Sequence, residues 1–367
     1  MKIGITTFQR AHNFGAQMQM FALYEFLRHM GHDVWILDYH CPAVEDNYVR
    51  RNPFMPLSKF FDVRVYPAIS ALIGAIKVMM HNYQPLKIKR FEDFLFSYFK
   101  LTKRFSDDKD MPIDFDVLIT GSDQLWNYFI TKGRRPVYFL DCPQIDLTKT
   151  TCISYAVSVE SNHFKDLEED GEYVKNALSK LSWISVREKS LSDFLLNHFN
   201  IKAETVLDPT LFLTKEQCKG IAVKPSETHY LCVYRVSRTD YLGELAKEIA
   251  KELGLAIVNI HSSTMASSKE ESYGPREIIG YICYSDMVLT SSFHGTALSI
   301  VNRKDFYSAY NGTSSRVQNI LSLLNLENRM LSSKEDYSGF SSVQYDDKLI
   351  DDVINQSKSL LVNALTK

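Results

Sequence analysis

The segment Met287–Ile300 combines a histidine with small polar residues where an apolar strand, Met287–Thr290, turns into an apolar helical run. The residues at this turn are Ser291, Ser292, His294, Gly295 and Thr296. Such a turn presents free backbone N–H groups and the positive end of a helix dipole, which together bind anions. A histidine there titrates near neutral pH and can transfer protons. The pattern predicts chemistry on a phosphorylated or carboxylated small molecule; the alternative is an exposed histidine in an ordinary strand–helix turn.

Polar residues also follow three other predicted strands. These turns are Asn13–Gln17, Gly121–Gln124 and Ser185–Glu188. Binding loops of open parallel sheets lie at the carboxyl ends of the strands, so we expect all four turns to face a cleft between two domains. Each turn alone is a weak signal, because Gly, Ser and Asn favour turns for conformational reasons.

The elements that must position these turns alternate between strand and helix, which is typical of parallel sheets covered by helices on both faces. The predicted strands are Lys2–Thr6, Val34–Leu37, Asp116–Thr120, Cys152–Ala156, Trp183–Val186, Thr205–Leu207, His229–Arg235, Ala256–Ile260 and Met287–Thr290. The predicted helices are Ala16–His29, Ile88–Phe99, Tyr173–Leu181, Lys189–Asn197, Tyr241–Leu253, Pro275–Tyr284 and Ser315–Leu324. Asp208-Pro209-Thr210 interrupts the alternation, so we expect an N-terminal α/β domain over 1–207 and a C-terminal α/β domain over 208–367.

Composition limits the class of protein. The chain has 367 residues, enough for two domains, and its 45% hydrophobic and 23% charged residues are typical of a soluble globular protein. A net charge of −2 gives no reason to expect a nucleic-acid partner. The six cysteines form no CxxC pair, which favours reduced thiols in a cytoplasmic protein and predicts no metal site. We expect no signal peptide and no membrane-spanning helix.

Charge is unevenly distributed along the chain. Basic residues outnumber acidic ones from 50 to 104, and Val63–Met80 within this segment is mostly apolar. Such a segment could lie on an anionic membrane surface, which would make the protein peripheral at the inner face of a membrane. The alternative is an insertion whose apolar face packs on its own domain.

The polar turns and several other short segments, taken together, resemble the polysaccharide pyruvyl transferase family in type and order. These segments are Asn13-x-Gly15-Ala16-x-x-Gln19, Gly121-Ser122-Asp123-Gln124-x-Trp126, Ser154-Tyr155-Ala156, Ser185-Val186-Arg187-Glu188, Asp208-Pro209-Thr210, Gly274-Pro275, Ser291-Ser292-Phe293-His294-Gly295 and Ser314-Ser315-Arg316. The resemblance implies two Rossmann-like domains facing a cleft, in the GT-B-like architecture of glycosyltransferases. It also implies transfer of an enolpyruvate-derived group from phosphoenolpyruvate to two hydroxyls of a sugar, which forms a cyclic pyruvate ketal without a metal or other cofactor. Acceptors of this family are often lipid-linked glycans.

The resemblance assigns roles to residues. It implies that His294 acts as the acid or contacts the phosphate, and that Asp123 orients or deprotonates an acceptor hydroxyl. Ser291, Ser292, Gly295 and Thr296 would lie at the phosphate, with Asn13 and Gln124 bonded to the sugar. Some members carry Arg where this chain has Ser292, so another cation must bind the phosphate or the carboxylate of the donor. Arg187 is the first candidate, because a guanidinium binds carboxylate or phosphate through two hydrogen bonds, and Arg235 and Arg316 are reserves.

Each of these residues also has a purely structural interpretation. Arg187 and Glu188 could form a surface ion pair, which contributes little to stability. Asp123 could cap a helix and Asn13 could form a turn. Asp208-Pro209 is typical of a linker turn. Trp126 and Tyr155 are more typical of core aromatic residues than of sugar platforms.

Three classes of function remain open from the sequence. The first is a pyruvyl transferase that uses phosphoenolpyruvate. The second is a GT-B-type glycosyltransferase, which would bind a nucleotide sugar instead. The third is a non-catalytic glycan-assembly protein that keeps the fold, although the presence of His294, Arg187 and Asp123 favours an enzyme.

Overall fold

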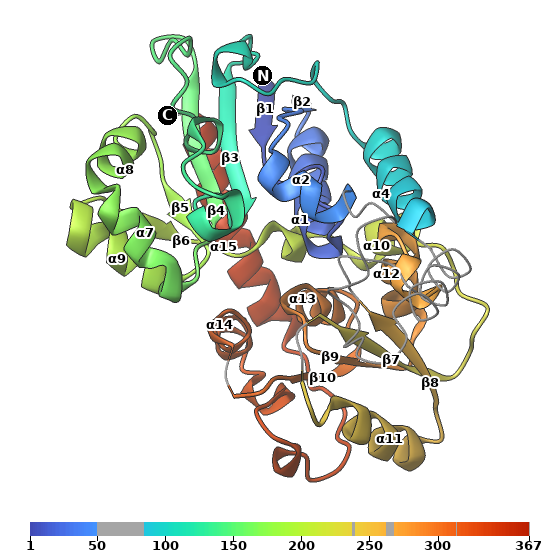
Figure 1. Ribbon diagram of the computed structural model, residues 1–367. Coiled ribbons are helices and arrows are strands. Elements are labelled where there is room, and N and C mark those ends of the chain that lie inside the picture. The colour runs from blue at the N-terminus through green and yellow to red at the C-terminus, as the bar shows by residue number, and fades with distance from the viewer. Residues whose placement is uncertain (50–83, 237–238, 262–267, 313, 367) are drawn as a thin grey trace, which may run out of the picture.

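The computed structural model describes residues 1–49, 84–236, 239–261, 268–312 and 314–366. Two parallel sheets, one in each half of the chain, form its framework (Figure 1). The two sheets confirm the expected class, two Rossmann-like α/β units in a GT-B-like arrangement.

The first sheet has six strands in the order β2-β1-β3-β4-β5-β6, and every pairing is parallel. Its strands are β1 (Lys2–Thr6), β2 (Asp33–Ile36), β3 (Val117–Asp123), β4 (Thr151–Val157), β5 (Ser185–Val186) and β6 (Glu204–Thr205). The helices of this half are α1 (Phe14–His29), α2 (Pro42–Val49), α4 (Gln84–Tyr98), α5 (Tyr128–Thr131), α6 (Pro136–Phe139), α7 (Phe164–Glu169), α8 (Gly171–Leu178) and α9 (Lys189–Phe199). The inner strands β3 and β4 are buried along nearly their whole length, because helices cover both faces of the sheet.

The second sheet has five strands in the order β11-β10-β9-β7-β8, again all parallel. Its strands are β7 (Tyr230–Arg235), β8 (Ala256–His261), β9 (Met287–Thr290), β10 (Asp305–Ala309) and β11 (Met330–Leu331). The helices that follow the first sheet are α10 (Lys215–Ile221), α11 (Leu242–Leu253), α12 (Pro275–Tyr284), α13 (Phe293–Val301), α14 (Ser315–Leu323) and α15 (Asp347–Leu365). The predicted bounds of β9 and α12 are confirmed to the residue.

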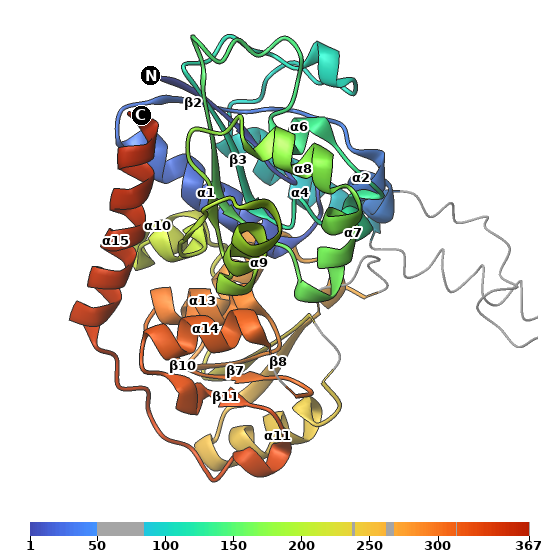
Figure 2. The same cartoon turned by 90° about the vertical axis from the view of Figure 1, so that its left-hand side faces the viewer.

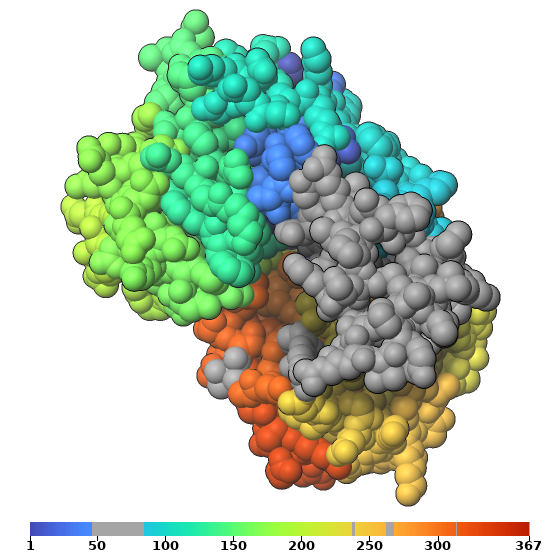
Figure 3. Space-filling model, viewed as in Figure 1, coloured from blue at the N-terminus to red at the C-terminus, as the bar shows by residue number. Residues whose placement is uncertain are grey.

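The two halves share one apolar core. Ile5 and Phe14 from the first half belong to the same buried cluster as Tyr234 and Val288 from the second. The rings of Phe14 and Tyr234 meet edge to face, with centroids 5.6 Å apart. In Figure 3 the green surface of the first half lies directly against the orange surface of the second. This packing fixes the positions of the two sheets relative to each other.

The last helix, α15, runs back from the second half along the first, so that the two chain ends lie near each other (Figure 2). It buries Ile350, Leu361 and Leu365 on one side. Its Ser357 hydroxyl accepts a hydrogen bond from the backbone N–H of Leu207 at 3.1 Å. The helix therefore stabilises the segment that connects the two sheets.

Most of the basic, apolar segment over 50–104 lies outside the described residues. Its described part includes α4, which buries Phe91, Phe94 and Leu95 against the protein. Arg90 of this helix forms an ion pair with Glu277 of α12 at 3.3 Å. The membrane contact proposed for this segment stays a prediction. Among the described residues, no helix is long and apolar enough to cross a membrane.

Candidate active site at the junction of the two sheets

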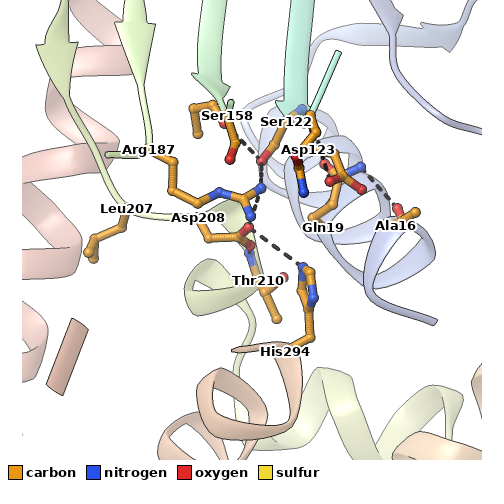
Figure 4. A network of polar contacts seen from close by, with 12 residues as sticks. Ala16, Gln19, Ser122, Asp123, Ser158, Arg187, Leu207, Asp208, Thr210 and His294 are labelled. Atoms are coloured by element: carbon orange, nitrogen blue, oxygen red, sulfur yellow. Dashed lines mark hydrogen bonds and ion pairs between the residues drawn. The ribbon is translucent and has the colours of Figure 1, made fainter. Parts of the chain in front are cut away.

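His294 is positioned by the turn between β9 and α13. The Thr290 hydroxyl accepts a hydrogen bond from the Ser292 N–H at 3.1 Å, which ends the strand. Ser292 is the N-cap of α13, and its hydroxyl accepts the Gly295 N–H at 3.3 Å. His294 therefore lies in the first turn of the helix, where its ring points toward the first half of the protein (Figure 4).

The N-terminus of α1 lies directly against the His294 ring. Asn13 caps this helix by accepting the Ala16 N–H at 3.1 Å. A Cβ atom on Gly15 would overlap the imidazole, which is why no larger residue fits there. Two helix N-termini, each the positive end of a dipole, thus meet at one histidine.

Arg187, Asp208 and His294 form a buried cluster at this junction (Figure 4). The Arg187 Nη2 atom lies 2.6 Å from Asp208 Oδ2, and it also donates to the Ser122 hydroxyl at 2.6 Å. The His294 Nε2 atom lies 3.7 Å from the same Asp208 oxygen. The other oxygen, Oδ1, accepts the Thr210 N–H at 2.8 Å. Arg187 follows β5, Asp208 lies between the sheets and His294 opens α13, so three distant segments build one site.

Electrostatics keep this cluster charged. Burial disfavours the Asp208 carboxylate, but the Arg187 guanidinium and the His294 ring outweigh that cost and lower the pKa of Asp208. Burial also opposes the charge of Arg187, yet Asp208, Glu188 and Asp123 together raise the pKa of its guanidinium. The site therefore holds a fixed cation beside a fixed carboxylate near neutral pH.

Several buried polar atoms of the cluster have no hydrogen-bond partner among the described residues. They are Arg187 Nε and Nη1, Thr210 Oγ1 and His294 Nε2, whereas Asp208 Oδ2 has Arg187 as its ion-pair partner. Buried polar groups are nearly always paired, and unpaired ones in a native structure mark strain, water or a ligand. All four unpaired atoms can donate a hydrogen bond, depending for the histidine on its tautomer, so the cluster matches an anionic or oxygen-rich ligand.

A cavity of about 530 Å³ adjoins the cluster. Arg187, Asp208 and Phe293 form part of its wall, and α14 and α15 contribute much of the rest. This volume lies within the range typical of small-molecule sites, about 300–1,000 Å³.

Asp123, Gln124 and Arg316, all predicted site residues, lie around Glu160. The Glu160 Oε1 atom accepts from Gln124 Nε2 at 3.3 Å and pairs with Arg316 Nη2 at 3.1 Å. Asp123 has a positive φ of 85°, and its carboxylate accepts the Gln124 N–H at 2.9 Å. Glu160 follows β4 and Arg316 belongs to α14, so this pair links the two halves.

The other predicted residues have structural partners. The Ser291 hydroxyl accepts the Val236 N–H at 3.0 Å. The Thr296 hydroxyl is fully buried and bonds to the Ser292 carbonyl and the Ser308 hydroxyl. Arg235 extends toward α11, where its Nη2 atom would lie 3.9 Å from a Cβ on Gly243. No contact of Arg235 with the Arg187–Asp208–His294 cluster occurs within the described part of the chain.

Asp208 is the residue that sequence reasoning undervalued. The segment Asp208-Pro209-Thr210 was expected to be a linker turn, and Asp208 does cap a short 3-10 helix, Pro209–Phe212. Its carboxylate is nevertheless buried and paired with Arg187, so the surface pair of Arg187 and Glu188 does not form. The signal that could have identified it is the place of Asp208-Pro209-Thr210 among the segments that carry the family resemblance. Trp126 and Tyr155 are core residues, as expected.

Glu188 is a second buried carboxyl, and its ionisation costs stability. Its Oε1 atom accepts the Ser158 hydroxyl at 2.7 Å, while Oε2 has no hydrogen-bond partner among the described residues. Burial raises the pKa of Glu188, and the charge of Arg187 only partly opposes that shift.

We expect Glu188→Gln to raise the free energy of unfolding at pH 8 and to have less effect near pH 4. The folded protein binds the Glu188 proton more tightly than the unfolded chain, so wild type loses stability as pH rises through this range. Denaturant unfolding at both pH values measures the difference. The exposed Glu172→Gln serves as the control. An equal effect of Glu188→Gln at both pH values would contradict the assignment.

Within the described residues, no group of three or more His, Cys, Asp or Glu side chains is arranged to hold a metal ion. The six cysteines are free and buried.

Comparison with protein families gives a match over most of the chain. A family model described as polysaccharide pyruvyl transferase matches residues 13–312. None of the curated proteins matches. Among solved structures, similar folds include the UDP-GlcNAc 2-epimerase from Methanocaldococcus jannaschii, with 10% identity over 99% of both chains and a TM-score of 0.49. The UDP-GlcNAc 2-epimerase from Neisseria meningitidis shows 12% identity over 100% of both chains and a TM-score of 0.48. A Streptomyces sp. SF2575 glycosyltransferase shows 13% identity, covering 99% of this chain and 96% of its own, with a TM-score of 0.38.

Proposed function

Because the chain belongs to the polysaccharide pyruvyl transferase family, we propose that it transfers a pyruvyl group from phosphoenolpyruvate to two hydroxyls of a sugar. The product is a pyruvate ketal on a polysaccharide or on a lipid-linked oligosaccharide. The observation that carries the proposal is the buried Arg187–Asp208–His294 cluster with its unpaired polar atoms. Phosphoenolpyruvate brings a phosphate and a carboxylate, and these donors suit both groups.

The reaction needs one proton donor and one fixed cation. His294 donates a proton to the methylene carbon of phosphoenolpyruvate, which leaves an oxocarbenium-like centre at the neighbouring carbon. A sugar hydroxyl attacks that carbon and returns its proton to His294. Inorganic phosphate then leaves, a second hydroxyl attacks the same carbon, and its proton passes to the phosphate. Arg187 stabilises the anionic groups throughout, and Asp208 keeps the guanidinium in place.

Asp123 and Gln124 are the groups proposed to hold the acceptor sugar. Asp123 is the last residue of β3, and Gln124, the residue after it, donates a hydrogen bond to Glu160 on the first half of the chain. The phosphate is proposed to bind at the N-terminus of α13. The Gly295 N–H of this turn already donates a hydrogen bond to the Ser292 hydroxyl. The Phe293 and His294 N–H groups are the remaining amides of this first turn.

Binding of phosphoenolpyruvate tests the proposal. We expect calorimetry to detect binding to wild type, and Arg187→Lys to weaken it on the order of tenfold to a hundredfold, since a charged hydrogen bond contributes about 1.5–3 kcal/mol. Lysine retains a charge for Asp208, so the fold is kept. The control is Arg28→Lys on α1, a half-exposed arginine that pairs with Glu25.

The same titration distinguishes this function from the two other classes of function, a glycosyltransferase and a non-catalytic assembly protein. Binding of nucleotide sugars in place of phosphoenolpyruvate would overturn the proposal in favour of glycosyl transfer. Binding of phosphoenolpyruvate without phosphate release in a broad screen of sugar diols would favour a non-catalytic assembly protein. Phosphate release that depends on an added sugar supports pyruvyl transfer.

A further inference from the structure

The cavity beside Arg187 and Asp208 is larger and more apolar than phosphoenolpyruvate requires. Its volume of about 530 Å³ falls in the range that holds drug-sized ligands, whereas phosphoenolpyruvate has three carbons and one phosphate. The apolar side chains of its wall include Leu211, Phe293, Ile320, Leu323, Val353 and Leu360. A three-carbon acid would leave most of these side chains without a ligand contact.

The charged groups of the same wall favour an anion. Arg187, Lys189 and Arg316 line the cavity, and the carboxylate among the lining residues belongs to Asp208. Asp208 pairs with Arg187, Lys189 with Asp193 and Arg316 with Glu160. The donors of these cations that still lack a hydrogen-bond partner among the described residues are Arg187 Nε and Nη1, which lie next to apolar surface. A ligand that matches this wall carries an anionic group joined closely to an apolar one.

The cavity is also reached from the surface. Leu323 lies on its wall and is 50% exposed, so this edge of the cavity is open to solvent. The opposite side is formed by the segment 205–208 and by α15, whose Ser357 fixes the Leu207 backbone. The apolar wall thus extends from the Arg187–Asp208 pair outward to solvent.

We propose that this cavity is the subsite for an apolar aglycone, carried by the acceptor directly beside the sugar that receives the pyruvyl group. The inference rests on the proposed function, because it assigns the reacting groups to the Arg187 end of the cavity. The sugar lies at the Asp123–Gln124 side, the donor anion lies at Arg187, and the aglycone fills the space between α14 and α15. The substrate is therefore amphiphilic close to the reacting sugar.

A series of n-alkyl phosphates from ethyl to octyl, used below micelle-forming concentrations, tests the subsite by calorimetry. The phosphate binds the cations and the chain enters the cavity. Each buried methylene contributes about 0.8 kcal/mol, so we expect the dissociation constant to fall about fourfold per carbon until the cavity is full. Methyl phosphate and phosphoenolpyruvate report on the anion site alone.

Two variants of the wall sharpen the test. Leu323→Glu places a negative charge at the exposed edge and should remove most of the chain-length dependence while phosphoenolpyruvate still binds. Its control is Leu196→Glu, a similarly exposed leucine on α9 outside the cavity. Val353→Phe fills part of the space and should shorten the chain length at which affinity stops rising. Val353 is only half-buried, so the fold tolerates the larger ring.

The outcomes separate this inference from the proposed function. Phosphoenolpyruvate binding with no dependence on alkyl chain length, in wild type as in Leu323→Glu, overturns the subsite and leaves pyruvyl transfer standing. If the affinity for alkyl phosphates rises with chain length but phosphoenolpyruvate does not bind, the proposed pyruvyl transfer is overturned. The aglycone assignment is then overturned too, because it rests on that function. A change of oligomeric state in Leu323→Glu without chain-length dependence assigns the wall to a contact between two copies, and this also overturns the proposal.

Discussion

Replacing Asp208 with asparagine lowers the free energy of unfolding by about 3–5 kcal/mol, the cost of breaking a buried ion pair by removing one partner. The side chains of Asp208 and Arg187 are 0% and 4% exposed, so the variant leaves a buried guanidinium without its carboxylate partner. Asparagine keeps the size of the side chain, and the loss therefore reflects charge rather than a cavity. Denaturant unfolding at pH 7 measures it.

The matched control is Asp193→Asn. Asp193 pairs with Lys189 at 2.6 Å, the same distance, but both side chains are more than half exposed. An exposed pair contributes about 0–1 kcal/mol, so the control should change stability little. If Asp208→Asn costs no more than Asp193→Asn, the buried pair does not stabilise the junction of the two sheets. Replacing both partners, as Arg187→Met with Asp208→Leu, should recover much of the loss while abolishing anion binding.

The pH dependence of this effect has a definite sign. Burial opposes ionisation of Asp208, but Arg187 and His294 outweigh it, so the folded-state pKa of Asp208 lies below the value near 3.9 expected in the unfolded chain. The stabilisation by the pair is therefore complete above the unfolded pKa and is lost as pH falls toward the folded pKa. The gap in stability between wild type and Asp208→Asn should narrow as the pH is lowered from 5.

The sequence predicted both sheets because their strands are short apolar runs separated by helices of clear periodicity. In α11, Leu242, Leu245, Ala246 and Ile249 form one buried stripe, and the helix ends at Gly254 in the left-handed conformation. The strand β10 was not predicted, because it spans five residues, Asp305–Ala309, without a clear apolar pattern. Elements with a strong pattern of apolar residues were therefore predicted. The strand β10, which forms through its pairing with β9 and β11, was not.

The helix α15 was missed although its sequence carried a signal. Asp346 caps it by accepting the Leu349 N–H at 2.9 Å, and Ile350, Leu361 and Leu365 lie on the buried side. The many polar residues between them weaken the periodicity. This omission mattered for the site, because α15 closes the cavity beside Arg187 and stabilises the segment that bears Asp208.

The candidate site was predicted where one short segment carries its chemistry, as at Ser292 and His294. Asp208 could not be ranked from the sequence, because its partners are Arg187 and His294, far away along the chain. Whether a carboxylate before a proline caps a turn or anchors a guanidinium depends on tertiary packing alone. The role of Gly15 was equally hidden, since the feature that requires glycine is a histidine on another helix.

Gly15→Ala should lower the proposed pyruvyl transfer activity on the order of 10²–10⁴-fold, as much as His294→Gln, because the added methyl group displaces the general acid. The Cβ atom would overlap the imidazole ring at Nδ1, and the α1 backbone cannot retreat from a position held by the Asn13 cap. Alanine suits a helix better than glycine by about 1 kcal/mol, so the helix itself has no reason to unfold. Phosphate release with an acceptor sugar measures the activity, and the His294 ring signals in NMR report the displacement directly.

Gly220→Ala is the matched control, since Gly220 lies in α10 with no atom within 4 Å of a Cβ added there. We expect it to keep full activity and to gain a little stability from helix propensity. The decisive comparison is the double variant Gly15→Ala with His294→Gln. If Gly15 acts only by positioning His294, the double variant is as active as either single variant, because residues that work as one unit are not additive. A loss equal to the product of the two single losses would instead give Gly15 a role of its own, such as the close approach of the α1 N-terminus to the phosphate. Non-additivity would show that both helix N-termini act through His294. This residue belongs to α13, and the fold places its ring against the N-terminus of α1.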